Sequence, residues 1–313
     1  MITTFLKRKI TFFIIIIIIL GMYILFNKNE PITTTYQPVN NDYIYLLDND
    51  NYLVRTNQYV INDNELNNIK EKINYLIIDS KNNILINNNY QPTIPKNTKI
   101  IDIKIDNNII KINFTKELLN VSSKSEEKMI ESLIYTLTES SNINGIMIFV
   151  EGNILNKLPN SNKALPPLLT RDYGINKNYN LDNYKNTNHT TIYYIKDHNY
   201  LPVTFINNDS KEKIEVIIEE LKSNSLNQTN LISYLKANAI LEDYEILNDS
   251  INLSFNKYIF EDLNSQEILE EVKYAIYLSV RDNYHVKEVN YLYNSQVISQ
   301  IKTWKISDFM LYF

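Results

Sequence analysis

The sequence contains no cysteine, only three histidines and only four glycines in 313 residues. Without cysteine the chain can form no disulfide, thiolate metal site or cysteine nucleophile, and it can carry no lipid on an N-terminal cysteine. Gly21, Gly145, Gly152 and Gly174 are too scattered for a P-loop, a GxGxxG nucleotide loop or a GxSxG nucleophile elbow. No HExxH motif is present, and a zinc site would need carboxylates beside the few histidines. We therefore expect no catalytic site, no cofactor and no metal site.

A long apolar run near the N-terminus indicates a membrane anchor. Ile10 to Phe26 is a 17-residue run broken only by Thr11 and Gly21. As a helix it would span roughly 26 Å, just enough for a hydrocarbon core of about 30 Å. Lys7, Arg8 and Lys9 precede the run, so the positive-inside rule places the N-terminus in the cytoplasm and residues 27–313 outside. A cleaved signal peptide is the alternative, but this run is longer than a typical signal sequence and lacks a small-residue cleavage site.

The charge of the exported part excludes one class of partner. The first 26 residues carry three positive charges and no acid, so the remainder carries eight net negative charges against five for the whole chain. We therefore expect no binding of nucleic acid through bulk charge.

The rest of the chain repeats itself in order. Asn51-Tyr52-Leu53 recurs as Asn199-Tyr200-Leu201, and "NNIIKINFTK" at 107–116 parallels "NDSINLSFNK" at 248–257. The second pair alternates apolar and polar residues, which predicts half-buried strands. Each is followed by an apolar helical face, Met129 to Leu137 in one copy and Ile268 to Ile276 in the other, and then by a closing strand.

Each copy therefore predicts strand, strand, helix, strand, strand, helix, strand, an α+β unit in which helices cover one face of a small sheet. Ser123 with Glu126 resembles a capping box at the start of the second helix. The expected segments are 1–26 (cytoplasmic tip and transmembrane anchor), 27–41 (spacer), 42–156 (first domain), 157–185 (Pro/Gly connector), 186–300 (second, divergent domain) and 301–313 (tail).

Three stretches of the chain resemble the GerMN family. They are "IPKNTKIIDIKIDNNIIKINFTKEL" from Ile94, "EEKMIESLIYTLTESSNINGIMIFVEG" from Glu126 and "LPNSNKALPPLLTRDYGIN" from Leu158. The second copy keeps the apolar pattern, but Ala275-Ile276 stands in place of the family's Thr-Leu and Asn294-Ser295 in place of Glu-Gly. The resemblance implies two tandem GerMN domains in an exported protein of spore formation or germination. The GerMN fold is also similar to ring-building modules, which implies assembly with other proteins.

The family-motif positions are candidate structural or interface residues. They are Phe114, Thr136, Leu137, Thr138, Glu151, Gly152, Pro167, Leu168, Arg171, Gly174 and Asn176.

Other side chains admit both a structural and a functional interpretation. Glu127 and Glu131 stand one helical turn apart and could share a cation, but Lys124 and Lys128 beside them favour a solvated helix face. Arg171-Asp172 could dock a partner or form an intramolecular salt bridge that fixes the two domains.

Tyrosines near the strands could stack on the sugar rings of cell wall, although tyrosine is also a good strand former. They are Tyr43, Tyr45, Tyr193, Tyr194, Tyr291 and Tyr293.

Three classes of function remain. The leading hypothesis is a non-enzymatic, single-pass membrane protein that assembles with other exported or membrane proteins, as a homo-oligomer or ring among other forms. The alternative is an exported module that binds the peptidoglycan cell wall. A hydrolase ranks last, because no nucleophile with a base and no metal-ligand constellation is visible.

Overall fold

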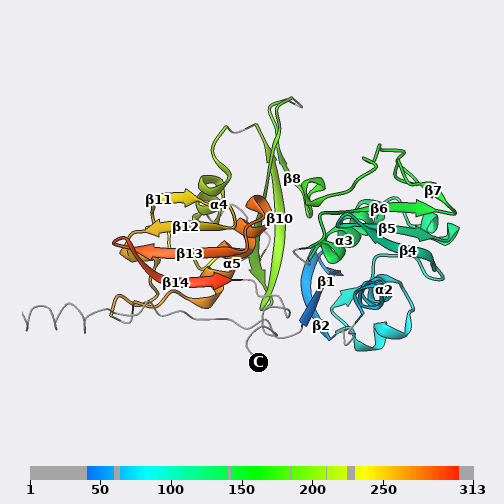
Figure 1. Ribbon diagram of the computed structural model, residues 1–313, viewed down its shortest axis with the longest axis horizontal. Coiled ribbons are helices and arrows are strands. Elements are labelled where there is room, and N and C mark those ends of the chain that lie inside the picture. Colours follow the sequence, from blue (N-terminus) through cyan, green and yellow to red (C-terminus); the bar gives the residue numbers. More distant parts are fainter. Residues whose placement is uncertain are drawn as a thin grey trace, which may run out of the picture.

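The computed structural model describes residues 41–59, 64–139, 142–183, 185–208, 210–223, 230–264 and 266–302 (Figure 1). The expected anchor at 10–26 and most of the expected tail lie outside these residues. Among the helices that are described, none is long and apolar enough to cross a bilayer.

The described residues of the first half form seven strands and two α-helices. These are β1 (Asn41–Asp48), β2 (Leu53–Tyr59), α2 (Glu65–Leu76), β3 (Tyr90–Gln91), β4 (Ile100–Asp106), β5 (Ile109–Phe114), α3 (Glu126–Leu137), β6 (Gly145–Val150) and β7 (Asn153–Ile154), with 3-10 turns at Lys81–Leu85 and Lys116–Asn120.

A connecting segment leads to the second half, which repeats this order. It comprises a 3-10 turn (Arg171–Tyr173), β8 (Asn178–Asn180), β9 (Asn188–Lys196), β10 (Asn199–Asn207), α4 (Lys213–Lys222), β11 (Leu241–Ile246), β12 (Ser250–Phe255), a 3-10 turn (Lys257–Ile259), α5 (Glu270–Tyr284), β13 (Glu288–Tyr293) and β14 (Gln296–Lys302).

The same strand order in both halves confirms the expected α+β repeat. One four-stranded sheet has the order β4-β5-β6-β7 and the other β11-β12-β13-β14. In each, the first two strands are antiparallel, the middle pair is parallel across a helical crossover, and the last pair is antiparallel. An antiparallel hairpin precedes each sheet, β1-β2 in one half and β9-β10 in the other.

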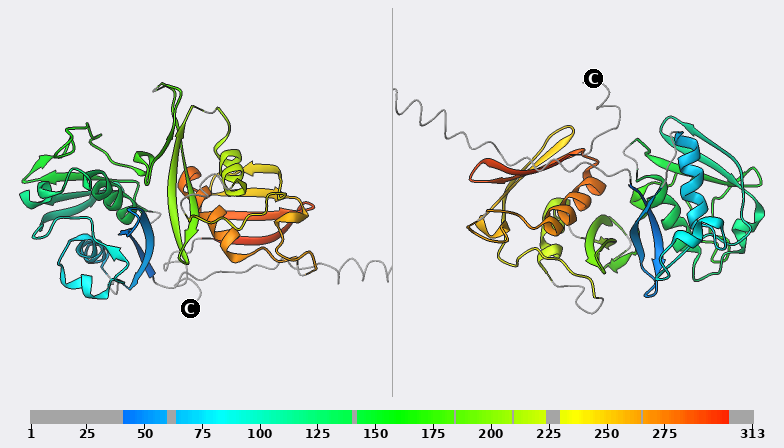
Figure 2. Two further views of the ribbon diagram at one scale, coloured as in Figure 1. Left: turned by 180° about the vertical axis from the view of Figure 1, so that it is seen from behind. Right: turned by 90° about the horizontal axis from the view of Figure 1, so that it is seen from below.

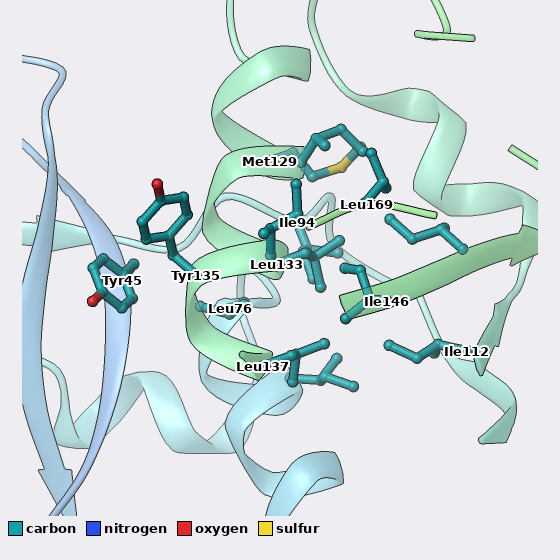
Figure 3. Close-up of a cluster of buried hydrophobic side chains, with 14 of the residues drawn as sticks. Tyr45, Leu76, Ile94, Ile112, Met129, Leu133, Tyr135, Leu137, Ile146 and Leu169 are labelled. Carbon is teal, nitrogen blue, oxygen red and sulfur yellow. The ribbon is translucent and has the colours of Figure 1, made fainter. Parts of the chain in front are cut away.

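The repeat predicted helices that cover one face of a single small sheet in each domain. In the structure, α3 and α5 are instead covered on two sides. α3 contacts both β1 and β6, and α5 contacts both β9 and β13, so each helix lies between a hairpin and a four-stranded sheet. In Figure 3, Met129, Leu133 and Leu137 point toward the sheet, whereas Tyr135 lies on the side of Tyr45 in the hairpin. The apolar stripe identified the sheet-facing side of α3 and gave no signal for its second buried side, which carries Ser, Thr and Tyr.

Asparagine and aspartate replace glycine at most of the turns. The two-residue turns after β4 and β9, Asn107-Asn108 and Asp197-His198, have positive φ at both positions. Glu151-Gly152 after β6 and Asn294-Ser295 after β13 do the same. Such turns match the right-handed twist of a hairpin, and Asn and Asp tolerate the left-handed conformation better than most residues. A chain with four glycines can therefore still form tight hairpins.

The two halves pack hairpin against hairpin. Figures 1 and 2 show β1-β2 and β9-β10 side by side in the middle of the molecule, with the helices and four-stranded sheets outward on each side. β2 and β10 are adjacent in one mixed sheet that also contains β1, β3, β8 and β9. Successive residues of β2 face different cores, because Leu53 belongs to the apolar core of the first half and Val54 to that of the second.

Candidate functional site: an ion-pair seam between the halves

Where the hairpins meet, a side chain from the connector replaces backbone pairing. β2 and β10 share one register pair, Arg55 with Tyr200. Farther along, the Asn176 side chain accepts a hydrogen bond from Leu53 N at 2.9 Å and donates to Leu53 O and Pro202 O at 2.8 Å each. Pro202 has no backbone N–H to offer, so an amide side chain that both donates and accepts suits this gap.

The same tyrosine–carboxylate pair occurs in each half. Tyr45 on β1 donates from its hydroxyl to Glu139 Oε2 at 2.9 Å, just after α3. Tyr193 on β9 donates to Asp282 Oδ2 at 2.6 Å, near the end of α5. The two hydroxyl oxygens lie 3.0 Å apart. The backbone N–H of each tyrosine also donates to a helix hydroxyl. The acceptor is Thr136 in the first half and Ser279 in the second. The duplication thus brings two equivalent pairs together at the centre of the molecule.

Arg171 joins the two pairs. Its Nη2 lies 2.8 Å from Glu139 Oε2 and its Nη1 lies 2.5 Å from Asp282 Oδ2. Its Nε donates to Thr138 Oγ1 at 3.1 Å, and Nη2 also donates to Tyr135 O at 3.2 Å. A guanidinium group presents its donors in a planar fork, so one side chain can reach both carboxylates. Of the two roles expected for Arg171, docking a partner or an intramolecular salt bridge, the structure thus shows the salt bridge.

Two further arginines converge on the carboxylate of Glu139. Arg55 on β2 donates to Glu139 Oε1 through Nε at 3.0 Å and Nη2 at 2.7 Å. Arg281 on α5 approaches the same carboxylate from the second half, with Nη2 at 3.2 Å from Oε1. Glu139 is therefore bound by one arginine from each half and one from the connector.

We call this cluster the seam. It consists of Tyr45, Arg55, Glu139, Arg171, Tyr193, Arg281 and Asp282.

The environment of the seam keeps the Glu139 carboxylate and the three arginines charged. Burial raises the pKa of Glu139, but the charges of Arg281, Arg55 and Arg171 outweigh burial and hold that pKa well below its usual range. Burial and the nearby Glu139 charge raise the pKa of Tyr45 to about 12, so its hydroxyl remains a donor. The buried carboxylates are thus paired and hydrogen-bonded, which is the condition under which buried charge is tolerated.

Two other ion-pair groups reinforce the contact between the halves and the connector. Lys196 on β9 binds Asp48 and Asp50, at the β1-β2 turn, with Nζ–O distances of 2.5 Å. Glu131 on α3 is only 2 % exposed and is bound by Lys128 and Lys177.

The expected solvated face for Glu131 is therefore wrong. The connector folds over it, and the backbone N–H of Asn176 donates to Glu131 Oε2 at 3.1 Å. Glu127 does remain on the surface, where it pairs with Lys163.

The expected capping box at α3 is also wrong. The helix begins at Glu126 after Ser125, and the Ser125 side chain makes no capping hydrogen bond. Glu126 is instead buried and accepts hydrogen bonds from the backbone N–H groups of Asn160 and Ser161 in the connector.

The structure distributes the family-motif positions over five environments. Thr136, Thr138, Arg171 and Asn176 touch the seam or the gap beside it. Gly174 has φ of +80°, and a Cβ there would meet Thr204 at 3.1 Å. Phe114 and Leu137 lie in the first core, Glu151-Gly152 form the β6-β7 turn, and Pro167 and Leu168 lie exposed in the connector.

The strand tyrosines are poorly placed to stack on sugars. Tyr45, Tyr193, Tyr194 and Tyr291 are buried. Of the other two, Tyr43 lies under the Arg55 guanidinium, 3.3 Å from ring centroid to Cζ, and Tyr293 packs edge-on against Phe260.

Four seam residues were not predicted from the sequence: Arg55, Glu139, Arg281 and Asp282. One signal was available. The chain contains only four arginines against 27 lysines, and three of those four arginines meet at Glu139. In so lysine-rich a chain, arginine marks places where a planar, permanently charged fork is required.

In the described ranges, no group of three histidine or acidic side chains could hold a metal ion. The expectations that the chain is not an enzyme and needs no metal stay predictions.

The chain is similar to proteins of spore formation and germination. Residues 43–156 match the family model Germane, described as "Sporulation and spore germination". Spore germination protein GerM of Bacillus subtilis is 26% identical over 263 residues, covering 81% of this chain and 71% of the relative. The solved structure of the tandem GerMN domains of the sporulation protein GerM from Bacillus subtilis superposes with a TM-score of 0.72 at 23% identity, covering 83% of this chain and 93% of the other. The duplicated hairpin–helix–sheet units thus have the fold of tandem GerMN domains, and the first of them, residues 43–156, matches the family model.

Proposed function

We propose that this chain acts in spore formation or germination as a non-enzymatic, membrane-anchored, extracytoplasmic assembly component. The single observation that carries the proposal is the seam. Its buried ion pairs tie Arg55, Glu139 and Arg281 of the two domains to Arg171 of the connector. A pair of domains held at one fixed angle suits a protein that positions partners, because rigid spacing lowers the entropy cost of binding them.

Two further features support this role. The sequence similarity to a spore germination protein supports a sporulation-related process. The apolar run Ile10 to Phe26 supports an anchor, which would confine the domains to the membrane surface and raise their effective concentration. Lateral association could use the sheet edges β4 and β11, whose outward flanks are largely exposed.

The test is genetic and biochemical. In the source organism, deletion of the gene should lower the yield of heat-resistant spores or their germination, and the wild-type chain should restore it. Crosslinking in native membranes during spore formation should capture the chain with itself or with one defined exported protein. The Arg171→Gln variant should lose that crosslink, whereas Lys111→Gln, which removes one exposed ion pair in the first domain, should keep it.

Protease added to intact, wall-stripped cells should digest residues 27–313. Protection of that part would overturn the topology. A chain that binds purified peptidoglycan and crosslinks to no protein would replace the assembly role by wall binding.

A further inference from the structure

We propose that Arg55 and Arg281, which we call the rim of the seam, form a binding site for one oxyanion, a carboxylate or a phosphate. Such binding is independent of the assembly role.

The seam carries one more positive than negative charge. Three guanidinium groups face two carboxylates, so one positive charge is left without a partner of opposite sign. The side chains of Arg55, Arg171 and Arg281 are 9 %, 10 % and 16 % exposed, and those of Glu139 and Asp282 are less exposed still. Charges withdrawn this far from water are normally neutralised, because their solvation is lost on burial.

The hydrogen bonds of the three arginines show where the excess charge lies. Arg171 is saturated, since Nε, Nη1 and Nη2 all donate hydrogen bonds. Arg281 is not, since Nη2 alone makes its contacts with Glu139 and Asp282, at 3.2 to 3.4 Å. Within the part of the chain that the structure describes, Nε and Nη1 of Arg281 and Nη1 of Arg55 have no hydrogen-bond partner. The uncommitted donors thus belong to the two rim arginines.

The two rim arginines lie next to each other. Arg55 and Arg281 both donate to Glu139 Oε1, so their guanidinium groups are neighbours. The Tyr43 ring fixes the plane of Arg55 by cation–π contact. Paired guanidinium groups with free N–H edges bind the oxygens of carboxylates and phosphates in forked hydrogen bonds. Because Arg55 comes from the first domain and Arg281 from the second, a bound oxyanion would add a bridge between the domains.

The experiment measures thermal unfolding of the full-length protein against rising inorganic phosphate in one arm and acetate in the other, with chloride at equal ionic strength as the reference. Binding to the folded state alone raises the melting midpoint along a one-site curve. The wild-type chain should show this saturable rise in at least one arm. A preference for phosphate indicates a phosphate-bearing ligand, and a preference for acetate indicates a carboxylate of a partner.

Arg281→Gln, which removes the more exposed of the two rim arginines, should raise the half-saturating concentration at least about tenfold. Lys287→Gln is the matched control, because Lys287 pairs with Asp249 at the surface of the same domain and should respond like the wild type. If Arg281→Gln does not fold, Arg281→Lys is measured instead, which keeps the charge and loses the fork. The proposal is overturned if neither anion gives a saturable rise, or if the Arg281 variant responds as the wild type does.

Discussion

The C-terminal ends of α3 and α5 occupy equivalent positions, yet they carry unequal shares of the charge at the seam. Each supplies a carboxylate that accepts a hydrogen bond from a hairpin tyrosine. Glu139, after α3, binds three arginines, whereas Asp282 binds Arg171 closely and Arg281 only at 3.4 Å. Duplication thus explains the tyrosine–carboxylate pairs, and the arginines break their symmetry. The carboxylate that makes most of the ion pairs at the seam therefore comes from the first domain.

Replacing Glu139 should have the largest effect. Glu139→Gln leaves three buried guanidinium groups facing a neutral amide, and removing one partner of a buried ion pair typically costs about 3–5 kcal/mol. We expect a loss of that size in the free energy of unfolding of fragment 36–313, measured by chemical denaturation. The exposed pair of Lys111 with Asp106 is the control, and Lys111→Gln should cause no measurable change. Equal losses in the two variants would contradict the account.

Acid should undo part of the same interaction. Because the arginines lower the pKa of Glu139 below its ordinary 4.5, the folded state binds its proton less readily than the unfolded chain does. The stabilisation is therefore complete above about pH 5 and is lost as the pH falls through the folded-state pKa. Between pH 7 and pH 3 the wild-type fragment should lose more stability than the Glu139→Gln fragment, because the variant has no carboxyl group to protonate at position 139. Parallel pH profiles for the two proteins would rule out this linkage.

Asp282→Asn should be less damaging than Glu139→Gln. Arg171 would keep its bonds to Glu139, so the loss is that of charged hydrogen bonds at one end, about 2 kcal/mol. The same denaturation experiment measures it. An Asp282 variant less stable than the Glu139 variant would reverse the proposed asymmetry.

The two tyrosines should behave alike. Tyr45→Phe and Tyr193→Phe each remove one hydroxyl that donates to a carboxylate, and each should cost about 1 kcal/mol. A difference of more than about 1 kcal/mol between them, in the same assay, would show that the pairs are not energetically equivalent.

Sequence patterns sufficed for the repeated elements and failed at the contacts between distant segments. Alternation in "NNIIKINFTK" and "NDSINLSFNK" predicted β5 and β12, because a half-buried strand leaves a period of two in its own residues. Glu131 looked solvated because its helix neighbours are lysines, and the connector that covers it lies about 45 residues away. Arg55, Glu139 and Arg281 lie far apart along the chain, so no local pattern links them.

The central claim is that the seam holds the two domains at one fixed arrangement. The absence of cysteine allows a direct test, because Lys104→Cys on β4 and Glu242→Cys on β11 would be the only thiols for spin labels. Electron–electron double resonance on fragment 36–313 should give one narrow distance distribution. Adding Arg171→Gln should broaden that distribution while circular dichroism shows that both domains remain folded. An equally narrow distribution with and without Arg171 would contradict the account.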